Sequence, residues 1–246
     1  MEKSFGKDEK GQVTEGETTA VAKSEETAVA VNRPVPKVLQ TKARGFEGEV
    51  TTAEIITPYI SLVGKTGDLS DEFDPGSFVY DKSTEICNKN ESFDITLIKA
   101  KLVYVEDLDY EDKSEPEVFN SLREAMEAGF HNEWSQKDDG KYVKPRLDCV
   151  VLFEVSEELP AHEFEGKHYA LGAWSFQNSN YTKAGKKMVN ALTKGWLREG
   201  VYLGTWKMSS VYETGGEFKY YHCLAKRGEM HTPEFIQFLE DEVLMD

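Results

Sequence analysis

The sequence contains little cysteine and no long apolar run. Its 246 residues include three cysteines (Cys87, Cys149 and Cys223), which form no disulfide framework and are typical of a reduced cytosolic protein. No stretch approaches the roughly 18 consecutive apolar residues of a membrane span. The N-terminus lacks the apolar core of a secretory signal, so we expect neither a membrane protein nor an exported one.

Positive charge is also scarce. The chain has 29 Lys and Arg residues against 45 Asp and Glu residues, a net charge of −16. This balance excludes a generally basic protein that coats duplex DNA through its overall charge. Apolar residues make up 39%, which is low for a globular protein, so part of the chain is not expected to pack. Aromatic residues, at 11%, are too frequent for a wholly disordered chain.

Composition divides the chain into three segments. Residues 1–45 carry seven acids and eight bases, with Phe5 as their one aromatic residue. They have too little apolar surface to offset the entropy of ordering, so we expect disorder, with a transient helix at 25–31 as the milder alternative. Residues 46–228 are expected to fold. Residues 229–246 hold six acids and neither Lys nor Arg, and form an acidic amphipathic tail or helix.

Strand-like segments dominate the folding part of the chain. Short strands are predicted at 59–63, directly after Pro58, and at 78–80. β-Branched and aromatic residues predict five longer strands, at 94–105, 147–155, 168–176, 201–212 and 217–225. The last two are joined around Gly215-Gly216, which is a good hairpin signal.

Three segments have helical periodicity. The segment 180–194 carries one apolar face and ends at Gly195; the face consists of Tyr181, Ala184, Met188, Val189 and Leu192. The acid-rich segment 106–133 predicts a helix that starts at 114–117 and ends at Gly129; its face consists of Val118, Leu122 and Met126. Thr232-Pro233 starts a last amphipathic helix, with these residues inward: Phe235, Ile236, Leu239 and Val243.

The order of these elements predicts a fold that is mainly β with α, of the α+β class. Five strands with a helix between the third and the fourth are the ground plan of an OB-fold-like five-stranded barrel, a fold noted for binding oligonucleotides and oligosaccharides. The acid-rich segment becomes a long insert between the first two strands. A different α+β sheet with the same element order is the alternative.

Motifs for catalysis and metal binding are incomplete. The segment 64–66 resembles the end of a phosphate-binding loop, but Tyr59 stands where the first glycine is required. The acids of 107–111 are followed by Asp112 where a calcium loop needs glycine. His222 and Cys223 lack the companions of a zinc site. We therefore expect no enzyme activity, no metal and no cofactor.

One basic stretch contrasts with the acidic chain. Residues 183–207 carry six cations against Glu199, a net charge of +5; the cations are Lys183, Lys186, Lys187, Lys194, Arg198 and Lys207. Aromatic residues lie in or beside it, namely Trp174, Phe176, Tyr181, Trp196, Tyr202 and Trp206. Interleaved cations and aromatic rings suit single-stranded nucleic acid, because phosphates need cations and each stacked base contributes roughly 1–3 kcal/mol.

The same residues also fit an ordinary folded domain. Tryptophans on strands are most often core residues, and lysines opposite an apolar helical face are most often its solvated side. Lys99 and Lys101 share one face of the strand 94–105, whereas Trp206 and Lys207 lie on opposite faces of their strand. Alternation alone does not say which face is the core.

Several short motifs resemble those of bacteriophage-encoded single-stranded DNA-binding proteins with an OB-fold. The run 57–63 is similar to the Pro-x-[Ile/Leu]-x-Leu strand of that family, and 74–78 is similar to the turn that follows it. The long strand 94–105, the strand 173–176, the lysine-bearing helix and the glycine-rich hairpin are similar too. The resemblance spans about residues 55–226 and implies single-strand binding, with an acidic C-terminus that recruits replication or recombination proteins.

Together the residues and the resemblance predict a non-enzymatic single-stranded DNA-binding protein that protects unpaired strands in phage replication or recombination, in the host cytoplasm. The predicted stacking residues are Trp174, Phe176, Tyr202 and Trp206, and the predicted phosphate contacts are Lys99, Lys101, Lys183, Lys187, Arg198 and Lys207. The alternative is an acidic interaction protein, either a virion component or a DNA-mimicking anti-defence factor, that binds a basic host protein. A metal-dependent nuclease ranks below both, and the sequence leaves oligomerisation open.

Overall fold

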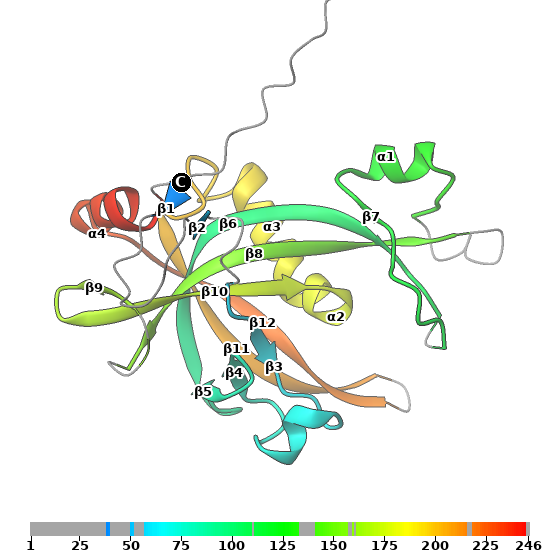
Figure 1. The fold of residues 1–246 in the computed structure, drawn as a ribbon, viewed down its shortest axis with the longest axis horizontal. Helices are drawn as coiled ribbons and strands as arrows, with labels where there is room; N and C mark the ends of the chain where they lie inside the picture. The colour runs from blue at the N-terminus through cyan, green and yellow to red at the C-terminus, as the bar shows by residue number, and fades with distance from the viewer. Residues whose placement is uncertain are drawn as a thin grey trace, which may run out of the picture. The chain divides into compact units, whose positions relative to one another are not determined.

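The protein is mainly β with few helices. The computed structural model describes residues 57–109, 111–132, 141–156, 159, 161–215 and 218–244, and the backbone of the strand pair β1 (Val38–Leu39) and β2 (Val50–Thr51). The predicted disorder of residues 1–45 otherwise lies outside the described residues. The named strands pair in antiparallel sheets, which confirms the expected α+β class (Figure 1).

The largest sheet that the described residues form has seven strands. Its five long strands are β6 (Ser92–Glu106), β8 (Val143–Val155), β10 (Lys167–Phe176), β11 (Gly204–Gly215) and β12 (Phe218–Met230). They lie in the order β12-β11-β6-β8-β10, and the short strand β9 (His162–Phe164) pairs with β10. The chain forms β6, β8 and β10 in succession and then returns to place β11 beside β6. This is the Greek-key order.

The sheet remains open in the described part of the chain, where β10 and β12 form no ladder with each other. The strands thus form no closed barrel in this part of the chain, and the predicted OB-fold-like five-stranded barrel is not confirmed. A smaller antiparallel sheet approaches both of these strands instead. It consists of β3 (Ile60–Leu62), β4 (Phe78–Tyr80) and β5 (Thr84–Cys87), with the short helix η2 (Asp68–Asp71) between β3 and β4. Beside β10, the Ala173 N–H donates to the Pro58 carbonyl at 2.8 Å.

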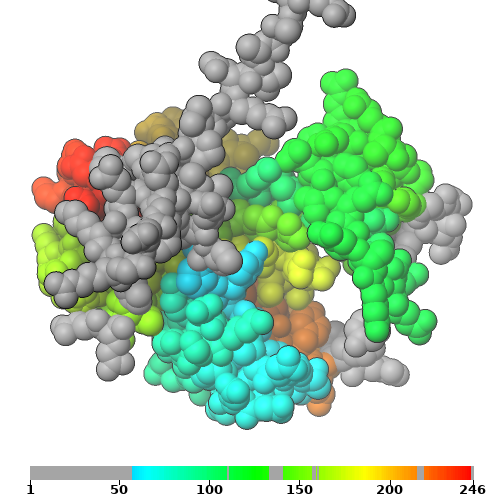
Figure 2. All heavy atoms as spheres, viewed as in Figure 1, coloured from blue at the N-terminus to red at the C-terminus, as the bar shows by residue number. Residues whose placement is uncertain are grey.

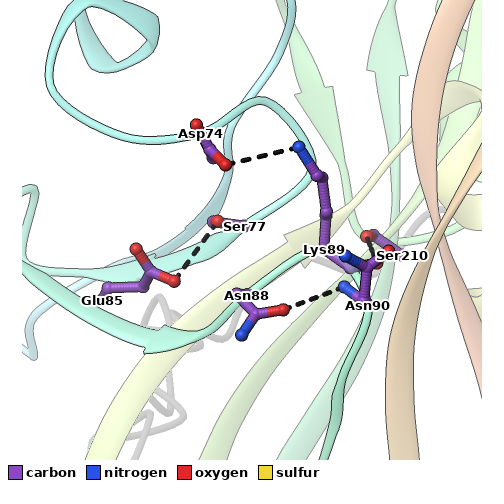
Figure 3. A network of polar contacts seen from close by, with 7 residues as sticks. All are labelled: Asp74, Ser77, Glu85, Asn88, Lys89, Asn90 and Ser210. Carbon is purple, nitrogen blue, oxygen red and sulfur yellow. Dashed lines mark hydrogen bonds and ion pairs between the residues drawn. The ribbon is translucent and has the colours of Figure 1, made fainter.

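A glycine turn brings the small sheet against β12. Gly76 has φ +98°, and a Cβ on it would lie 2.6 Å from Cε1 of Tyr221. Both the left-handed backbone and the close approach require glycine here. Polar contacts tie the same region to β11: Lys89 pairs with Asp74 at 3.3 Å, and the Ser210 hydroxyl donates to the Lys89 carbonyl at 3.3 Å (Figure 3).

The core lies on the inner face of the large sheet, which we define as the face that carries Trp174 and Trp206. Both tryptophans are only 3% exposed. Aromatic rings from three elements meet there: Trp174 stacks on Phe93 with centroids 6.1 Å apart, and Phe78 of β4 meets Trp174 edge-on at 5.5 Å. The small sheet thus contributes to the main core.

A helical segment covers the edge of β12. It consists of α2 (Asn178–Asn180), η4 (Tyr181–Gly185) and α3 (Lys186–Lys194), and it ends at Gly195 as predicted. The Asn180 side-chain oxygen accepts the backbone N–H of Cys223 at 2.7 Å, and Lys187 donates to the carbonyl of Ala225 at 3.4 Å. These contacts satisfy backbone groups that an edge strand would otherwise leave unpaired.

The C-terminal segment packs as a helix on the outer face of β6, β8 and β10. It comprises α4 (Pro233–Phe238) and η5 (Leu239–Val243), with Thr232 as its N-cap. Phe235 is 8% exposed and Leu239 is fully buried, and both pack against Ile98 and Leu152 of the sheet. Of the two alternatives for residues 229–246, the described part therefore forms the helix.

The acid-rich insert forms a small arm with its own cluster of buried residues. It contains β7 (Val118–Phe119), which pairs with the end of β6, and α1 (Leu122–Glu127). The predicted helix start at 114–117 is wrong, because Ser121 provides the N-cap by accepting the N–H of Glu124 at 3.1 Å. Val118 and Met126, predicted to share one apolar helical face with Leu122, are 49% and 57% exposed. Phe119, Ala125, Phe130 and Val143 form the cluster in their place.

Candidate nucleic-acid interface

The outer face of the large sheet leaves one row of residues open beside the C-terminal helix. Lys99 of β6 pairs with Val150 of β8, Val150 pairs with Ala173 of β10, and Ala173 forms an isolated bridge with Tyr59, just before β3. Neighbouring strands lie about 4.8 Å apart, so this row spans about 14 Å across four chain segments. A tyrosine stands at one end and a lysine at the other, with two small apolar residues between them.

A second row lies next to it along the strands. Lys101 pairs with Asp148, and Asp148 pairs with Ser175. The Asp148 carboxylate is engaged from two sides: Arg146 approaches it at 2.8 Å, and the Ser175 hydroxyl donates to it at 2.7 Å. Its negative charge is therefore matched by Arg146. Lys99, Lys101 and Arg146 against Asp148 give this area a net charge of +2 in a chain whose net charge is −16.

The two rows line a shallow hollow of about 320 Å³, which we call the β-face hollow. Its lining includes Tyr59, Lys99, Lys101, Asp148, Val150, Ala173 and Ser175. Tyr59 is 56% exposed, so a face of its ring is available to a ligand. The hollow thus presents an exposed aromatic ring and two lysines above a floor of small side chains.

Two elements bound the β-face hollow along the strands. On one side, α4 and η5 bury Ile98, the residue before Lys99. On the other side, β7 pairs with Tyr104 and Val105 of β6. In Figure 2 the start of the described chain, coloured sky blue, lies beside green atoms of the sheet, with the arm that carries β7 and α1 to its right.

Three of the predicted stacking residues belong to the core. Trp174 and Trp206 are 3% exposed, and Phe176 is fully buried. Trp174 packs on Phe176 at 4.7 Å, and Trp206 packs on Trp196 at 5.3 Å. Because a base needs an accessible ring face, the assignment of these three side chains to stacking is corrected: they stabilise the fold. Tyr202, the fourth, is half-buried against the C-terminal helix and donates to Glu240 at 2.8 Å.

The predicted phosphate contacts separate into different parts of the fold. Lys99 and Lys101 line the β-face hollow together. Lys183 pairs with Glu213 at 2.8 Å, and Lys187 bonds the edge of β12, so both hold the helical segment in place. Arg198 is exposed after α3 and pairs with Glu199 at 3.4 Å. The structure thus does not gather the basic stretch 183–207 into one cationic surface.

Lys207 lies in a separate hollow of about 480 Å³ beside the C-terminal helix. It pairs with Asp94 at 3.4 Å, and Lys167 in the same hollow pairs with Glu154 at 2.7 Å. Each cation there has a carboxylate partner.

Tyr59 is the residue that the sequence-based choice of sites missed. Its signal was present in the run 57–63: Ile60 and Leu62 are the apolar alternates that pack inward, so Tyr59 faces the other way. Arg146 was missed as well, although Asp148 lies two positions further along the same strand and therefore on the same face.

In the described part of the chain, potential metal ligands do not cluster and the cysteines are buried. No group of three or more His, Cys, Asp or Glu residues there is placed to hold a metal ion. The three cysteines are buried and unpaired, and burial raises the pKa of the Cys87 thiol to about 11, which keeps it protonated at neutral pH. Among the same residues, no helix is both long and apolar enough to cross a membrane.

No protein-family model, no curated protein and no solved structure matches this chain.

Proposed function

We propose that this protein binds single-stranded DNA at the β-face hollow. One observation carries the proposal: an exposed tyrosine just before β3 and two lysines of β6 line the same hollow over small side chains. A single strand offers both phosphates and unpaired bases. Lys99 and Lys101 would contact phosphates, and Tyr59 would stack on a base.

The geometry favours a flexible single strand over a duplex. The hollow is shallow, and the described structure presents no basic helix next to it that could enter a major groove. Its local charge of +2 is small, so the stacked base supplies much of the affinity. The choice of DNA over RNA comes from the resemblance to phage proteins, as does the setting of phage replication or recombination in the host cytoplasm.

We also propose that the fold is an opened OB-type barrel. The Greek-key order of the long strands and the helix between the third and the fourth support this, since the OB-fold is a partly open Greek-key barrel. OB-folds bind ligands on the face of their second and third strands, which correspond here to β8 and β10. The β-face hollow lies on these two strands and on the neighbouring β6.

A titration with a labelled oligothymidylate tests the proposal. We expect saturable binding at low salt that weakens as salt rises, with a weaker response to a duplex of the same length. Each phosphate contact contributes about −0.7 to the slope of log K against log salt for single strands. The double variant Lys99→Gln, Lys101→Gln should therefore lose about 1.4 from this slope. The control is Lys194→Gln, an exposed lysine at the end of α3, which should change neither quantity.

One observation favours the alternative of an acidic interaction protein. The described cations are widely paired with carboxylates, as in Lys89–Asp74 and Lys183–Glu213, which leaves the net negative charge to dominate the surface. Such a protein would bind a basic partner through its acids. Absence of oligonucleotide binding at low salt, with a salt-sensitive complex with a basic protein, would favour this function over single-strand binding.

A further inference from the structure

Tyr212, near the end of β11, is the second exposed aromatic ring to consider. Among the described residues, the exposed large hydrophobic side chains include two aromatic ones, Tyr59 at 56% and Tyr212 at 43%. The exposed ring of Tyr59 belongs to the β-face hollow, whereas Tyr212 does not line it. Exposed rings are the groups that stack on unpaired bases.

A lysine accompanies this ring too. The Lys65 ammonium lies 4.5 Å from the centroid of the Tyr212 ring and donates a hydrogen bond to the Tyr212 hydroxyl. Lys65 is exposed and belongs to the loop that follows β3. The pair therefore repeats the combination of ring and cation found at Tyr59.

The Tyr212 ring is held in place from behind. It packs on Tyr221 of β12 with centroids 5.0 Å apart, and Tyr221 in turn lies against Gly76. Two residues before Tyr212, the Ser210 hydroxyl is bonded to the Lys89 carbonyl (Figure 3). A ring fixed in this way loses little freedom when a base stacks on it.

The strand β3 and the loop after it lead from Tyr59 to Lys65, the residue that contacts the Tyr212 ring. Tyr59 directly precedes β3, and Lys65 lies in the bend three residues after it. The two residues are six positions apart, which is at most about 20 Å of extended chain. Ile60 and Leu62 pack into the core, so the opposite side of β3 faces outward. Figure 2 shows the sky-blue and cyan residues of this segment and the orange residues of β12 on one side of the molecule.

We propose that Tyr212 and Lys65 form a second subsite for a base and a phosphate of single-stranded DNA, so that the strand runs along β3 from Tyr59 to Tyr212. This inference rests on the proposed function and extends it. The upper limit of about 20 Å between Tyr59 and Lys65 corresponds to at most about six stacked nucleotides at 3.4 Å each, within the site sizes of about 4–16 nucleotides known for OB-folds.

When a nucleotide binds at this subsite, Lys65 exchanges its contact with Tyr212 for a stronger contact with a phosphate. In the free protein the Lys65 ammonium donates to the Tyr212 hydroxyl and lies 4.5 Å from the ring centroid, an exposed contact. A phosphate gives the same ammonium a charge-assisted partner, and the exposed ring of Tyr212 accepts the base. Lys65 thus contacts the phosphate and Tyr212 stacks on the base, and these two residues are already in contact in the free protein.

The test uses the full chain and an oligothymidylate of about twelve nucleotides, long enough to reach both rings. Tyr212→Ala should weaken its binding about five- to a hundred-fold, the range expected for one stacked base. Tyr212→Phe keeps the ring and should stay within about twofold. Val211→Ala is the matched control, because Val211 is the adjacent exposed residue on the opposite face of β11.

Cross-linking provides a readout that does not depend on a variant's stability. An oligothymidylate with 5-iododeoxyuridine substitutions, irradiated with the wild-type protein, should yield a peptide cross-linked at Tyr212 as well as one at Tyr59. Loss of affinity in Tyr59→Ala but not in Tyr212→Ala, with cross-links confined to Tyr59, would overturn the second subsite and leave the proposed function standing. Absence of any oligonucleotide binding by the wild type would overturn both.

Discussion

On the inner face of the large sheet Trp174 is 3% exposed and Phe176 is fully buried, whereas on the outer face Tyr59 is 56% exposed beside two lysines. The two faces are built from the same strands, and successive residues of each strand alternate between them. The inner aromatic rings find partners from β4 and from β6, with Phe78 and Phe93 against Trp174. The comparison shows that aromatic residues near lysines in sequence need not lie near them in space.

The outer face is itself divided into two parts. At one end, Ile98 and Leu152 are covered by Phe235 and Leu239 of the C-terminal helix. At the other end the floor is made of small side chains, and the hollow stays open. The apolar residues of β6 and β8 thus mark where a helix packs, and the lysines of β6 mark where the sheet remains accessible.

Truncation of an inner-face ring should have the largest effect. Trp206→Ala removes a side chain that is 3% exposed and should lower the free energy of unfolding by about 3–5 kcal/mol. Trp206→Phe keeps an aromatic ring and loses an indole N–H that has no hydrogen-bond partner in the described structure, so its cost should be much smaller. Urea denaturation measures both variants. A loss of oligonucleotide affinity at unchanged stability would restore Trp206 as a stacking residue.

Truncation of a C-terminal helix residue that covers the outer face should have the second-largest effect on stability. Leu239→Ala opens a cavity beneath η5 and should cost about 2–5 kcal/mol of stability, with the affinity per folded molecule unchanged. Thermal melting and an oligonucleotide titration on the same sample separate the two quantities. Glu240→Gln is the control, because it alters the exposed contact with Tyr202 alone. Tighter binding with an unchanged melting temperature would show that the segment acts as a free acidic tail.

The sequence was sufficient to predict the order of the long strands, but not which face of the sheet is buried and which is exposed. The strands at 78–80, 94–105 and 168–176 carry residues whose β propensity agrees with their burial, so their positions were predictable. The site depends on pairings between segments far apart in the chain. The bridge that sets Tyr59 beside Ala173 joins residues more than a hundred positions apart, and no local pattern indicates it.

The insert shows a second limit of sequence reasoning. Helical spacing placed Val118 with Leu122, but pairing of β7 with Val105 draws Val118 into a strand and leaves it exposed. Tertiary pairing overrides helix periodicity in such a short segment. The short strands β5 and β9 were missed for the same reason, since each has only three or four residues and gains its structure from a neighbour.

In the open part of the outer face, removal of the exposed ring should reduce affinity rather than stability. Tyr59→Ala should weaken single-strand binding by about 1–3 kcal/mol if the ring stacks on a base. Tyr59→Phe should bind nearly as well, because it retains the stacking surface. Fluorescence anisotropy measures affinity, and thermal melting checks the fold. A fall in melting temperature with unchanged affinity would place Tyr59 among the structural residues, like Trp206.

Single-lysine variants should show different salt slopes of binding in the β-face hollow and in the helical segment. Lys101→Gln should lower the magnitude of the salt slope of binding by about 0.7, the value for one phosphate contact with a single strand. Lys183→Gln should leave this slope unchanged, since Lys183 holds Glu213 at 2.8 Å and does not line the hollow. Titrations at three or more salt concentrations give the slopes. Equal decreases in both variants would contradict a binding site confined to this face.

The smallest effect concerns pH and the junction between β12 and the C-terminal helix. The His231 ring lies 4.4 Å from that of Phe235, and its Nε2 is 2.8 Å from the Thr96 hydroxyl. Burial lowers the pKa of His231 from 6.5 to about 4, because it disfavours the charged imidazolium. Between these two values the unfolded chain binds a proton that the folded protein does not, so His231 destabilises the fold progressively as the pH falls from 6.5 toward 4. Above pH 6.5 it contributes no pH dependence.

We therefore expect the melting temperature of His231→Asn to fall less steeply than that of the wild type between pH 7 and 5. An NMR titration of the folded protein should find His231 still neutral at pH 5. Parallel melting profiles for the two proteins, or a charged ring at pH 5, would show that the C-terminal helix leaves His231 in contact with solvent.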